Sequence, residues 1–143
     1  ECVKIIKLMK KVKLINLPKI PDPRGNLSFF ENLNQIPFKI KRTYWIYDVP
    51  GGEFRGSHAF KRSQEFIVSL SGSFDVILND GDQEKRFQLN RSYTGLYVPN
   101  MTWRSLDNFS TNSVALIVSS ICYDESDYIR VFEKFKILKN ETK

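Results

Sequence analysis

Short apolar runs separated by turn residues make up the hydrophobic pattern of this chain. Apolar and polar residues alternate from Val12 to Leu17, and a period of two is typical of a strand with one buried face. Similar segments predict further strands at residues 27–31, 38–49, 64–70, 74–78, 85–89, 94–98, 102–106 and 113–122. Many short strands at regular spacing predict an all-β domain, either an antiparallel sandwich or a barrel.

Turn-forming residues lie between these segments. Residues 21–25 (PDPRG) predict a turn after the first strand. Ser71–Gly72–Ser73 and Asn79–Asp80–Gly81–Asp82 each have the composition of a tight turn between paired strands. We therefore expect two β-hairpins, one on each side of the strand at residues 74–78.

The helical signal of this chain lies near its C-terminus. Asp124 or Ser126 is a candidate N-cap for a helix through Tyr128, Ile129 and Phe132. No repeat, linker or low-complexity segment divides the 143 residues, a length that suits one domain. We expect an N-terminal extension at residues 1–10, a single domain at 11–138 and a C-terminal tail at 139–143.

The net charge of the chain is +6, and lysines cluster near its two ends. A basic balance suits nucleic acid, an acidic membrane surface or a phosphorylated small molecule. Lysines gathered at the ends favour a solvated surface over a nucleic-acid stripe, and no apolar stretch reaches the length of a membrane span. We therefore expect neither nucleic acid nor a membrane among the partners.

The two cysteines, Cys2 and Cys122, form neither a metal motif nor a disulfide framework. A reducing cytoplasm is therefore the expected location. The first residues are too short and too charged for a signal peptide, and Met9 begins a sequence typical of a native start.

Candidate site residues are concentrated at residues 52–72, GEFRGSHAFKRSQEFIVSLSG. Gly52, His58, Glu65 and Gly72 fit the spacing of the first cupin motif, G-x5-H-x-H-x4-E-x6-G, and Phe60 stands at the second histidine position. The period of two along a strand explains the H-x-H element, because both side chains then point into one barrel interior.

A second partial motif follows at residues 99–108 (PNMTWRSLDN). It keeps Pro99 and Asn108 of the cupin pattern P-x-G-x2-H-x3-N, with Met101 in place of the glycine and Arg104 in place of the histidine. Two partial motifs in the right order predict a cupin, that is, a double-stranded β-helix (jelly-roll) barrel, here with a short C-terminal helix.

The replaced positions predict a barrel without a metal or other cofactor. A metal-binding cupin offers three imidazoles and a carboxylate, whereas this chain offers His58 and Glu65. Phe60 cannot ligate, and Arg104 places a permanent cation at a former ligand position. Two ligands are too few for a dedicated catalytic metal centre.

The remaining groups suit proton abstraction beside a carbonyl. An imidazole such as His58 can accept and return a proton near neutral pH, and an inward arginine can hold an enolate oxygen or a phosphate. Other interpretations remain open at this point: His58 is a satisfied structural residue, Glu65 orients His58 or pairs with Lys61 or Arg62, and Arg104 forms a structural ion pair.

Four segments of this chain resemble the dTDP-4-oxo-6-deoxyglucose 3,4-ketoisomerases, the WxcM-like, FdtA/QdtA-type proteins. They are DPRGNLSFFE (22–31), KRTYWIYDVPGGEFRGSHAFKRSQEFIVSLSGS (41–73), GLYVPNMTWRSL (95–106) and CYDESDYIRVFEKF (122–135). The resemblance implies an isomerase that moves the carbonyl of a dTDP-linked 4-keto-6-deoxyhexose from C4 to C3 through an enediol. It also implies a homodimer that exchanges N-terminal strands, and a place in deoxysugar synthesis for lipopolysaccharide or another surface glycan.

The resemblance further implies which residues form the site. The expected catalytic residues are His58, Tyr47 and Arg55, and the expected substrate-binding residues are Arg42, Lys61, Glu65, Trp103 and Arg104.

Phe60 departs from the family, which has a second histidine at that position. Either His58 performs both proton transfers, with help from water or Tyr47, or the chain is a weak or inactive cupin that binds a sugar nucleotide. Further alternatives are a metal-dependent cupin such as a dioxygenase, against which the ligand count argues, and an epimerase of the same substrate.

Overall fold

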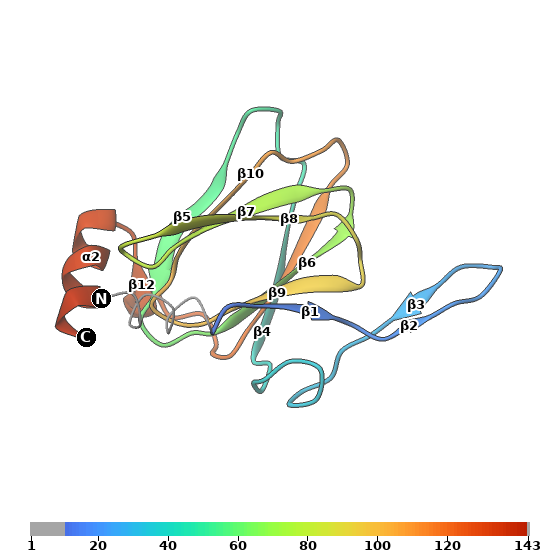
Figure 1. The fold of residues 1–143 in the computed structure, drawn as a ribbon, viewed down its shortest axis with the longest axis horizontal. Coiled ribbons are helices and arrows are strands. Elements are labelled where there is room, and N and C mark those ends of the chain that lie inside the picture. The colour runs from blue at the N-terminus through green and yellow to red at the C-terminus, as the bar shows by residue number, and fades with distance from the viewer. Residues whose placement is uncertain (1–10, 143) are drawn as a thin grey trace.

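Two five-stranded antiparallel sheets form the body of the protein in the computed structural model, which describes residues 11–142 (Figure 1). In spatial order, the first sheet contains β1 (Lys13–Asn16), β9 (Thr94–Val98), β6 (Glu65–Ser71), β11 (Val114–Ser119) and β4 (Arg42–Tyr47). The second contains β12 (Tyr128–Ile129), β5 (Arg55–Phe60), β10 (Trp103–Asp107), β7 (Phe74–Asn79) and β8 (Glu84–Leu89). This architecture confirms the prediction of an all-β domain.

Apolar side chains from both sheets fill the space between them. Ile67 on β6, Val76 on β7 and Ile117 on β11 belong to this core and are almost completely buried. Phe66 and Val68 point to the other face of β6, into a second cluster with Ile36 and Phe38 from the segment before β4. Because β6 is buried on both faces, three apolar residues, Phe66, Ile67 and Val68, follow one another in it without alternation.

The close packing of that second cluster explains a glycine on β9. A Cβ atom on Gly95 would lie 2.0 Å from Cζ of Phe66, so no larger side chain fits there without moving the ring.

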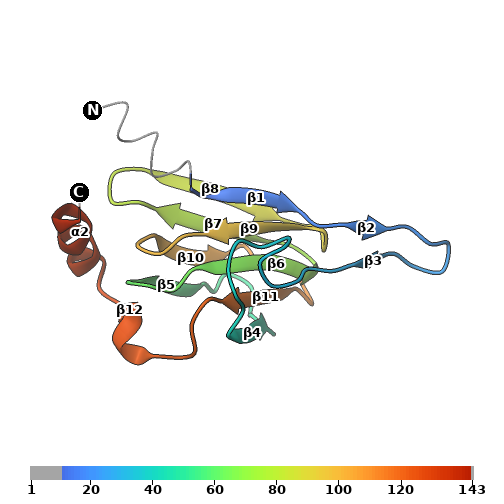
Figure 2. The same cartoon turned by 90° about the horizontal axis from the view of Figure 1, so that it is seen from below.

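A two-stranded arm and a helix project from opposite ends of the body (Figures 1 and 2). The arm consists of β2 (Lys19–Ile20) and β3 (Leu27–Ser28), joined through the turn predicted at residues 21–25. The helix is α2 (Phe132–Glu141), which packs on β5 and β12. Of the strand expected at residues 27–31, two residues form β3.

One of the two predicted hairpins is wrong. Asn79 to Asp82 joins β7 to β8, which pair as predicted. Ser71 to Ser73 instead carries the chain from the first sheet to the second, since β6 and β7 lie in different sheets. Gly72 makes this crossing with a φ of 68° and lies so close to Ser110 and Ser113 that a Cβ has no room.

The helix predicted after Asp124 is also wrong in its position. Asp124 does act as an N-cap, but for the single 3₁₀ turn η1 (Glu125–Asp127), where its side chain accepts from the Ser126 backbone. Tyr128 and Ile129 then pair with Phe60 and Ala59 on β5 as strand β12. Their backbone groups are used in the sheet, so the helix begins only at Phe132.

The expected boundary at residue 138 falls inside helix α2. Lys139 is buried, and its ammonium donates to the backbone carbonyl of Met101 at 2.7 Å. Lys139, the first residue of the segment that we expected as a tail, is therefore packed against the barrel. The expected extension at residues 1–10 lies outside the described residues, and none of the described helices has the length and apolar character needed to cross a bilayer.

Candidate active site

A cavity of about 330 Å³ lies between the two sheets, a volume suited to a small-molecule ligand. Strands β4, β5, β6, β10, β11 and β12 all contribute to its wall. Five of the eight residues that we predicted for the site line the cavity: Arg42, Arg55, His58, Glu65 and Arg104.

A β-bulge brings two of these residues to the same face of strand β5. Gly56 and Ser57 have φ values of 87° and 65°, and the register against β10 shifts between Arg104 and Ser105. Arg55 and His58 are three positions apart, so in a regular strand they would face opposite sides. The extra residue of the bulge turns both toward the cavity.

His58 lines the cavity and carries an unpaired acceptor atom. A hydrogen bond between the imidazole and the backbone of Gly56 raises the pKa of His58. A bond with this effect is one in which the ring N–H donates to the backbone. Nε2 is buried and has no hydrogen-bond partner among the described residues. The neutral ring therefore carries its lone pair on Nε2, where a base would need it.

The environment of His58 keeps this ring neutral. Burial first, and then the charges of nearby arginines, lower the pKa of His58 from 6.5 to about 3. The arginines responsible are Arg104, Arg130 and Arg42. Both effects disfavour the imidazolium, so the ring of the ligand-free protein is unprotonated at neutral pH and is a weak base until negative charge offsets the arginines.

Glu65 and Arg104 form a buried ion pair that joins the two sheets. Arg104 Nη1 donates to Glu65 Oε1 at 2.7 Å, and the two side chains are 2% and 1% exposed. The other carboxylate oxygen, Oε2, accepts from Tyr44 at 2.6 Å and from Ser119 at 2.7 Å. Of the alternatives left open by the sequence, the structure shows Glu65 paired with Arg104 rather than with Lys61, Arg62 or His58.

A row of aromatic and cationic groups covers one side of the cavity. The Tyr128 ring lies 5.0 Å from the His58 ring and 4.6 Å from the Phe60 ring. Its hydroxyl accepts from Arg42 Nη1 at 3.1 Å, and the Arg130 guanidinium lies 4.2 Å from its ring centroid. We missed Tyr128 and Arg130 as site residues, although both stand in the segment 122–135 that carries the family resemblance.

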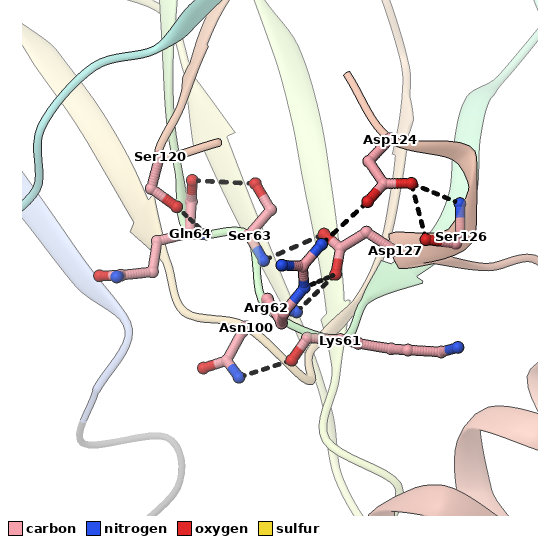
Figure 3. A network of polar contacts seen from close by, with 9 residues as sticks. All are labelled: Lys61, Arg62, Ser63, Gln64, Asn100, Ser120, Asp124, Ser126 and Asp127. Atoms are coloured by element: carbon pink, nitrogen blue, oxygen red, sulfur yellow. Dashed lines mark hydrogen bonds and ion pairs between the residues drawn. The ribbon is translucent and has the colours of Figure 1, made fainter. Parts of the chain in front are cut away.

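A polar network holds this wall against the barrel (Figure 3). The buried carboxylate of Asp127 accepts from the backbone N–H groups of Arg62 at 2.8 Å and Ser63 at 3.1 Å. Arg62 also donates to Asp124 at 2.9 Å, so the segment before Tyr128 is tied to the loop between β5 and β6. This network positions Tyr128 beside His58.

Three of the predicted site residues lie away from the cavity. Side chains alternate along β4, so Arg42, Tyr44 and Ile46 point inward while Tyr47 is 59% exposed. We correct the tyrosine expected at the site from Tyr47 to Tyr44 and Tyr128.

Trp103 and Lys61 are the other two residues outside the cavity. Trp103 points away from it because its neighbour Arg104 points inward, and its ring packs on Phe132 and Phe135 of α2. Lys61 follows the end of β5 and is exposed.

Two of the four metal-ligating positions of cupins hold other groups here, Phe60 and Arg104. Phe60 is buried, and the Arg104 guanidinium lies 4.9 Å from its ring centroid. Within residues 11–142, no group of three or more histidine, cysteine or acidic side chains is arranged to hold a metal ion. The expectation of metal-independent chemistry remains a prediction, supported by the identity of these residues.

Comparison with known proteins identifies the family to which this chain belongs. The chain matches the family described as "FdtA: WxcM-like, C-terminal" over residues 10–140. It is 44% identical to a TDP-4-oxo-6-deoxy-alpha-D-glucose-3,4-oxoisomerase from Aneurinibacillus thermoaerophilus over 124 residues, which cover 87% of this chain and 89% of the relative.

Two solved structures are similar over almost their whole length. A 3,4-ketoisomerase from Helicobacter canadensis has a TM-score of 0.88 and 39% identity, covering 90% of this chain and 97% of that one. The QdtA 3,4-ketoisomerase from Thermoanaerobacterium thermosaccharolyticum, in a mutant form with TDP-4-keto-6-deoxyglucose bound, has a TM-score of 0.89 and 34% identity, covering 92% and 95%.

The two sheets and the cavity between them define a cupin barrel, which confirms the predicted fold class. Within that class, the chain belongs to the FdtA, WxcM-like family of sugar 3,4-ketoisomerases. The family prediction made from residues 22–135 is confirmed.

The first testable consequence concerns the titration of His58. We expect its ring in the ligand-free protein to stay neutral from about pH 8 to about pH 5, where an ordinary imidazole protonates, because its pKa is lowered to about 3. His58 is the single histidine of the chain, so its ring signals in NMR spectra are unambiguous. Added pyrophosphate should raise the pKa by offsetting the arginine charges, and a ligand-free midpoint near 6.5 would contradict the burial described here.

The second consequence concerns the buried ion pair. Glu65→Ala should destabilise the protein by about 3–5 kcal/mol, because it leaves the Arg104 charge buried without a partner. Denaturant unfolding measures this loss. Asp22→Ala, which breaks an exposed ion pair with Arg24, is the control and should leave the midpoint unchanged. A similar small effect for both variants would show that Glu65 does not stabilise the fold.

Proposed function

We propose that the chain isomerises a TDP-linked 4-keto-6-deoxyhexose to its 3-keto isomer, with His58 as the proton-transferring base. The observation that carries this proposal is the unpaired Nε2 of a neutral imidazole on the cavity wall. The relatives support the substrate class: one is named an oxoisomerase of TDP-4-oxo-6-deoxyglucose, and another binds TDP-4-keto-6-deoxyglucose.

The proposed reaction needs one carbon-to-carbon proton transfer. Nε2 of His58 takes the proton from C3, and the electrons of that C–H bond form the C3–C4 double bond of an enediol. The imidazolium then returns the proton to C4, while the carbonyl forms at C3. Neither step changes the oxidation state of the sugar as a whole, so the reaction needs no external oxidant or reductant.

Arginines supply the positive charge that an anionic substrate and intermediate require. Arg55 is exposed at the cavity wall beside His58, and Arg42 lies opposite on β4. We propose that Arg55 binds the diphosphate or the developing oxyanion. Glu65 holds Arg104 in place, so we propose that the pair shapes the cavity and that Arg104 lowers the pKa of His58, while neither group moves the proton.

Because Phe60 stands where the family has a second histidine, a single imidazole must transfer the proton from C3 to C4. Its ring lies 4.9 Å from the His58 ring and is buried, so it forms an apolar wall beside the base. One base suffices if the proton leaves C3 and reaches C4 on the same face of the sugar.

We further propose that two copies of the chain associate through the β2–β3 arm, as exchange of N-terminal elements would require. Ile20 and Leu27 on the arm are 52% and 55% exposed, which leaves apolar surface for a second copy to cover. Strand β1 itself pairs with β9 of the same chain. Light scattering should give the mass of a dimer, and a monomer at micromolar concentration would contradict this proposal.

A cytoplasmic location and a role in deoxysugar synthesis for surface glycans complete the proposal. Cys122 is a free thiol, which fits a reducing compartment. Cell fractionation would test the location.

Hydrogen exchange in deuterated water tests the proposed activity. Wild-type protein incubated with TDP-4-keto-6-deoxyglucose should produce the 3-keto isomer and incorporate deuterium, both visible by NMR. His58→Asn should lower both rates by about 100-fold or more, because it removes the general base. The control Tyr47→Phe changes an exposed side chain outside the cavity and should match wild type.

Wild-type protein that binds TDP but neither exchanges nor isomerises would overturn the proposed enzyme. That result would instead identify a cupin that only binds the sugar nucleotide.

A further inference from the structure

Migration of a carbonyl between adjacent carbons needs a second proton relay, which acts on oxygen. While a proton passes from C3 to C4, the oxygen on C4 must gain a proton and the oxygen on C3 must lose one. The unpaired Nε2 of His58 serves the carbons in the function proposed above, and Phe60 carries no proton to exchange. A hydroxyl on the cavity wall can serve both oxygens, because adjacent carbons place them within reach of one group.

Tyr44 and Tyr128 are the two tyrosines that line the cavity. The Tyr44 hydroxyl donates to Glu65 Oε2 at 2.6 Å. Burial and the neighbouring carboxylate raise the pKa of Tyr44 far above its usual value of 10.0, because loss of its proton would place two anions side by side. Tyr44 is therefore fixed as a donor to Glu65 and is a poor proton relay.

Tyr128 lies beside positive charges, whereas Tyr44 lies beside the negative charge of Glu65. Its hydroxyl accepts a hydrogen bond from the Arg42 guanidinium at 3.1 Å, and Arg130 lies 4.2 Å from its ring centroid. Both cations lie where they can interact with negative charge on the phenol. Among residues 11–142 the Tyr128 hydroxyl has no acceptor for its own proton, which leaves that proton available to a ligand.

The position of Tyr128 also suits proton exchange with a bound sugar. Strand β12 pairs with β5 so that Tyr128 is opposite Phe60, two residues beyond His58. The ring lies 5.0 Å from the His58 ring, between centroids, on the wall of one cavity. A sugar whose C3 hydrogen faces His58 would therefore have the oxygens on C3 and C4 near this tyrosine.

We propose that Tyr128, with Arg42 as its hydrogen-bond donor, relays the proton between the two sugar oxygens. The phenol gives its proton to the oxygen on C4 as His58 removes the hydrogen from C3. The phenolate, held by Arg42, then takes the proton from the hydroxyl on C3 as that oxygen becomes the carbonyl. The phenol is restored, and the protons balance over the cycle. This inference rests on the proposed function.

Tyr128→Phe tests the inference because it removes the hydroxyl and keeps the ring. We expect kcat for isomerisation to fall by about 100-fold with KM changed little, in line with loss of a general acid–base group. Deuterium incorporation at C3 of the unreacted substrate should fall less, since His58 remains. The ratio of C3 exchange to isomerisation should therefore rise, an outcome that simple loss of folded protein would not produce.

Tyr123→Phe is the matched control. Tyr123 lies 5.9 Å from Tyr128 between ring centroids, but its hydroxyl donates to Glu125 and it does not line the cavity. We expect wild-type rates and an unchanged ratio. Arg42→Lys keeps a cation beside the hydroxyl and should lose less activity than Arg42→Met.

The outcomes separate this inference from the function on which it rests. An inactive wild-type protein would overturn the isomerase itself. An active wild type with a fully active Tyr128→Phe variant would overturn the oxygen relay alone. Equal losses of exchange and isomerisation in Tyr128→Phe, with TDP binding retained, would also overturn it, since Tyr128 would then act on the carbon transfer.

Discussion

The buried ion pair between Glu65 and Arg104 is the interaction on which the rest of the site depends. Two charges removed from water are costly unless their remaining hydrogen-bonding positions are filled. Here Tyr44 and Ser119 fill those of Glu65, and the Thr102 carbonyl accepts from Arg104 Nη2, while Arg104 Nε has no partner among residues 11–142. The partners lie on or beside strands β4, β6, β10 and β11, so satisfying the pair fixes how the two sheets meet.

The same pair connects the fold to the chemistry. Because Arg104 stays charged beside His58, it disfavours a second positive charge on the imidazole. Its guanidinium also lies over the Phe60 ring, which fills the place of a second imidazole with an apolar surface. A side chain that replaces a metal-ligating histidine of other cupins thus serves here as a structural anchor and as an electrostatic control on the base.

The sequence predicted the parts of this molecule that local spacing determines. The interval from Gly52 to Gly72 located His58 and Glu65 correctly, because turn positions and strand period are local properties. The same logic placed six of the nine predicted strands within one or two residues of their observed ends, as for Thr94–Val98, but the predicted strands did not include Arg55–Phe60. The family resemblance through residues 122–135 was correct although the helix predicted within that segment was not.

The errors arose where tertiary pairing decides the outcome. Aromatic residues occupy both faces of β4, so the sequence could not show that Tyr44 rather than Tyr47 faces inward. Ser71–Gly72–Ser73 has a hairpin composition, but burial of both flanking strands sends the chain into the other sheet. Tyr128 was read as helical because its pairing with Phe60, far away in sequence, is invisible to a local pattern.

The bulge at Gly56 and Ser57 has a consequence for how such a barrel can change over evolutionary time. Since Arg55 and His58 share a face only because one residue is extra, deleting a single codon there would turn the guanidinium out to solvent while the imidazole stayed in place. Replacement of a side chain, as at Phe60, leaves the backbone path intact. The spacing between Arg55 and His58 is therefore more tightly constrained by the structure than the identity of most residues between them.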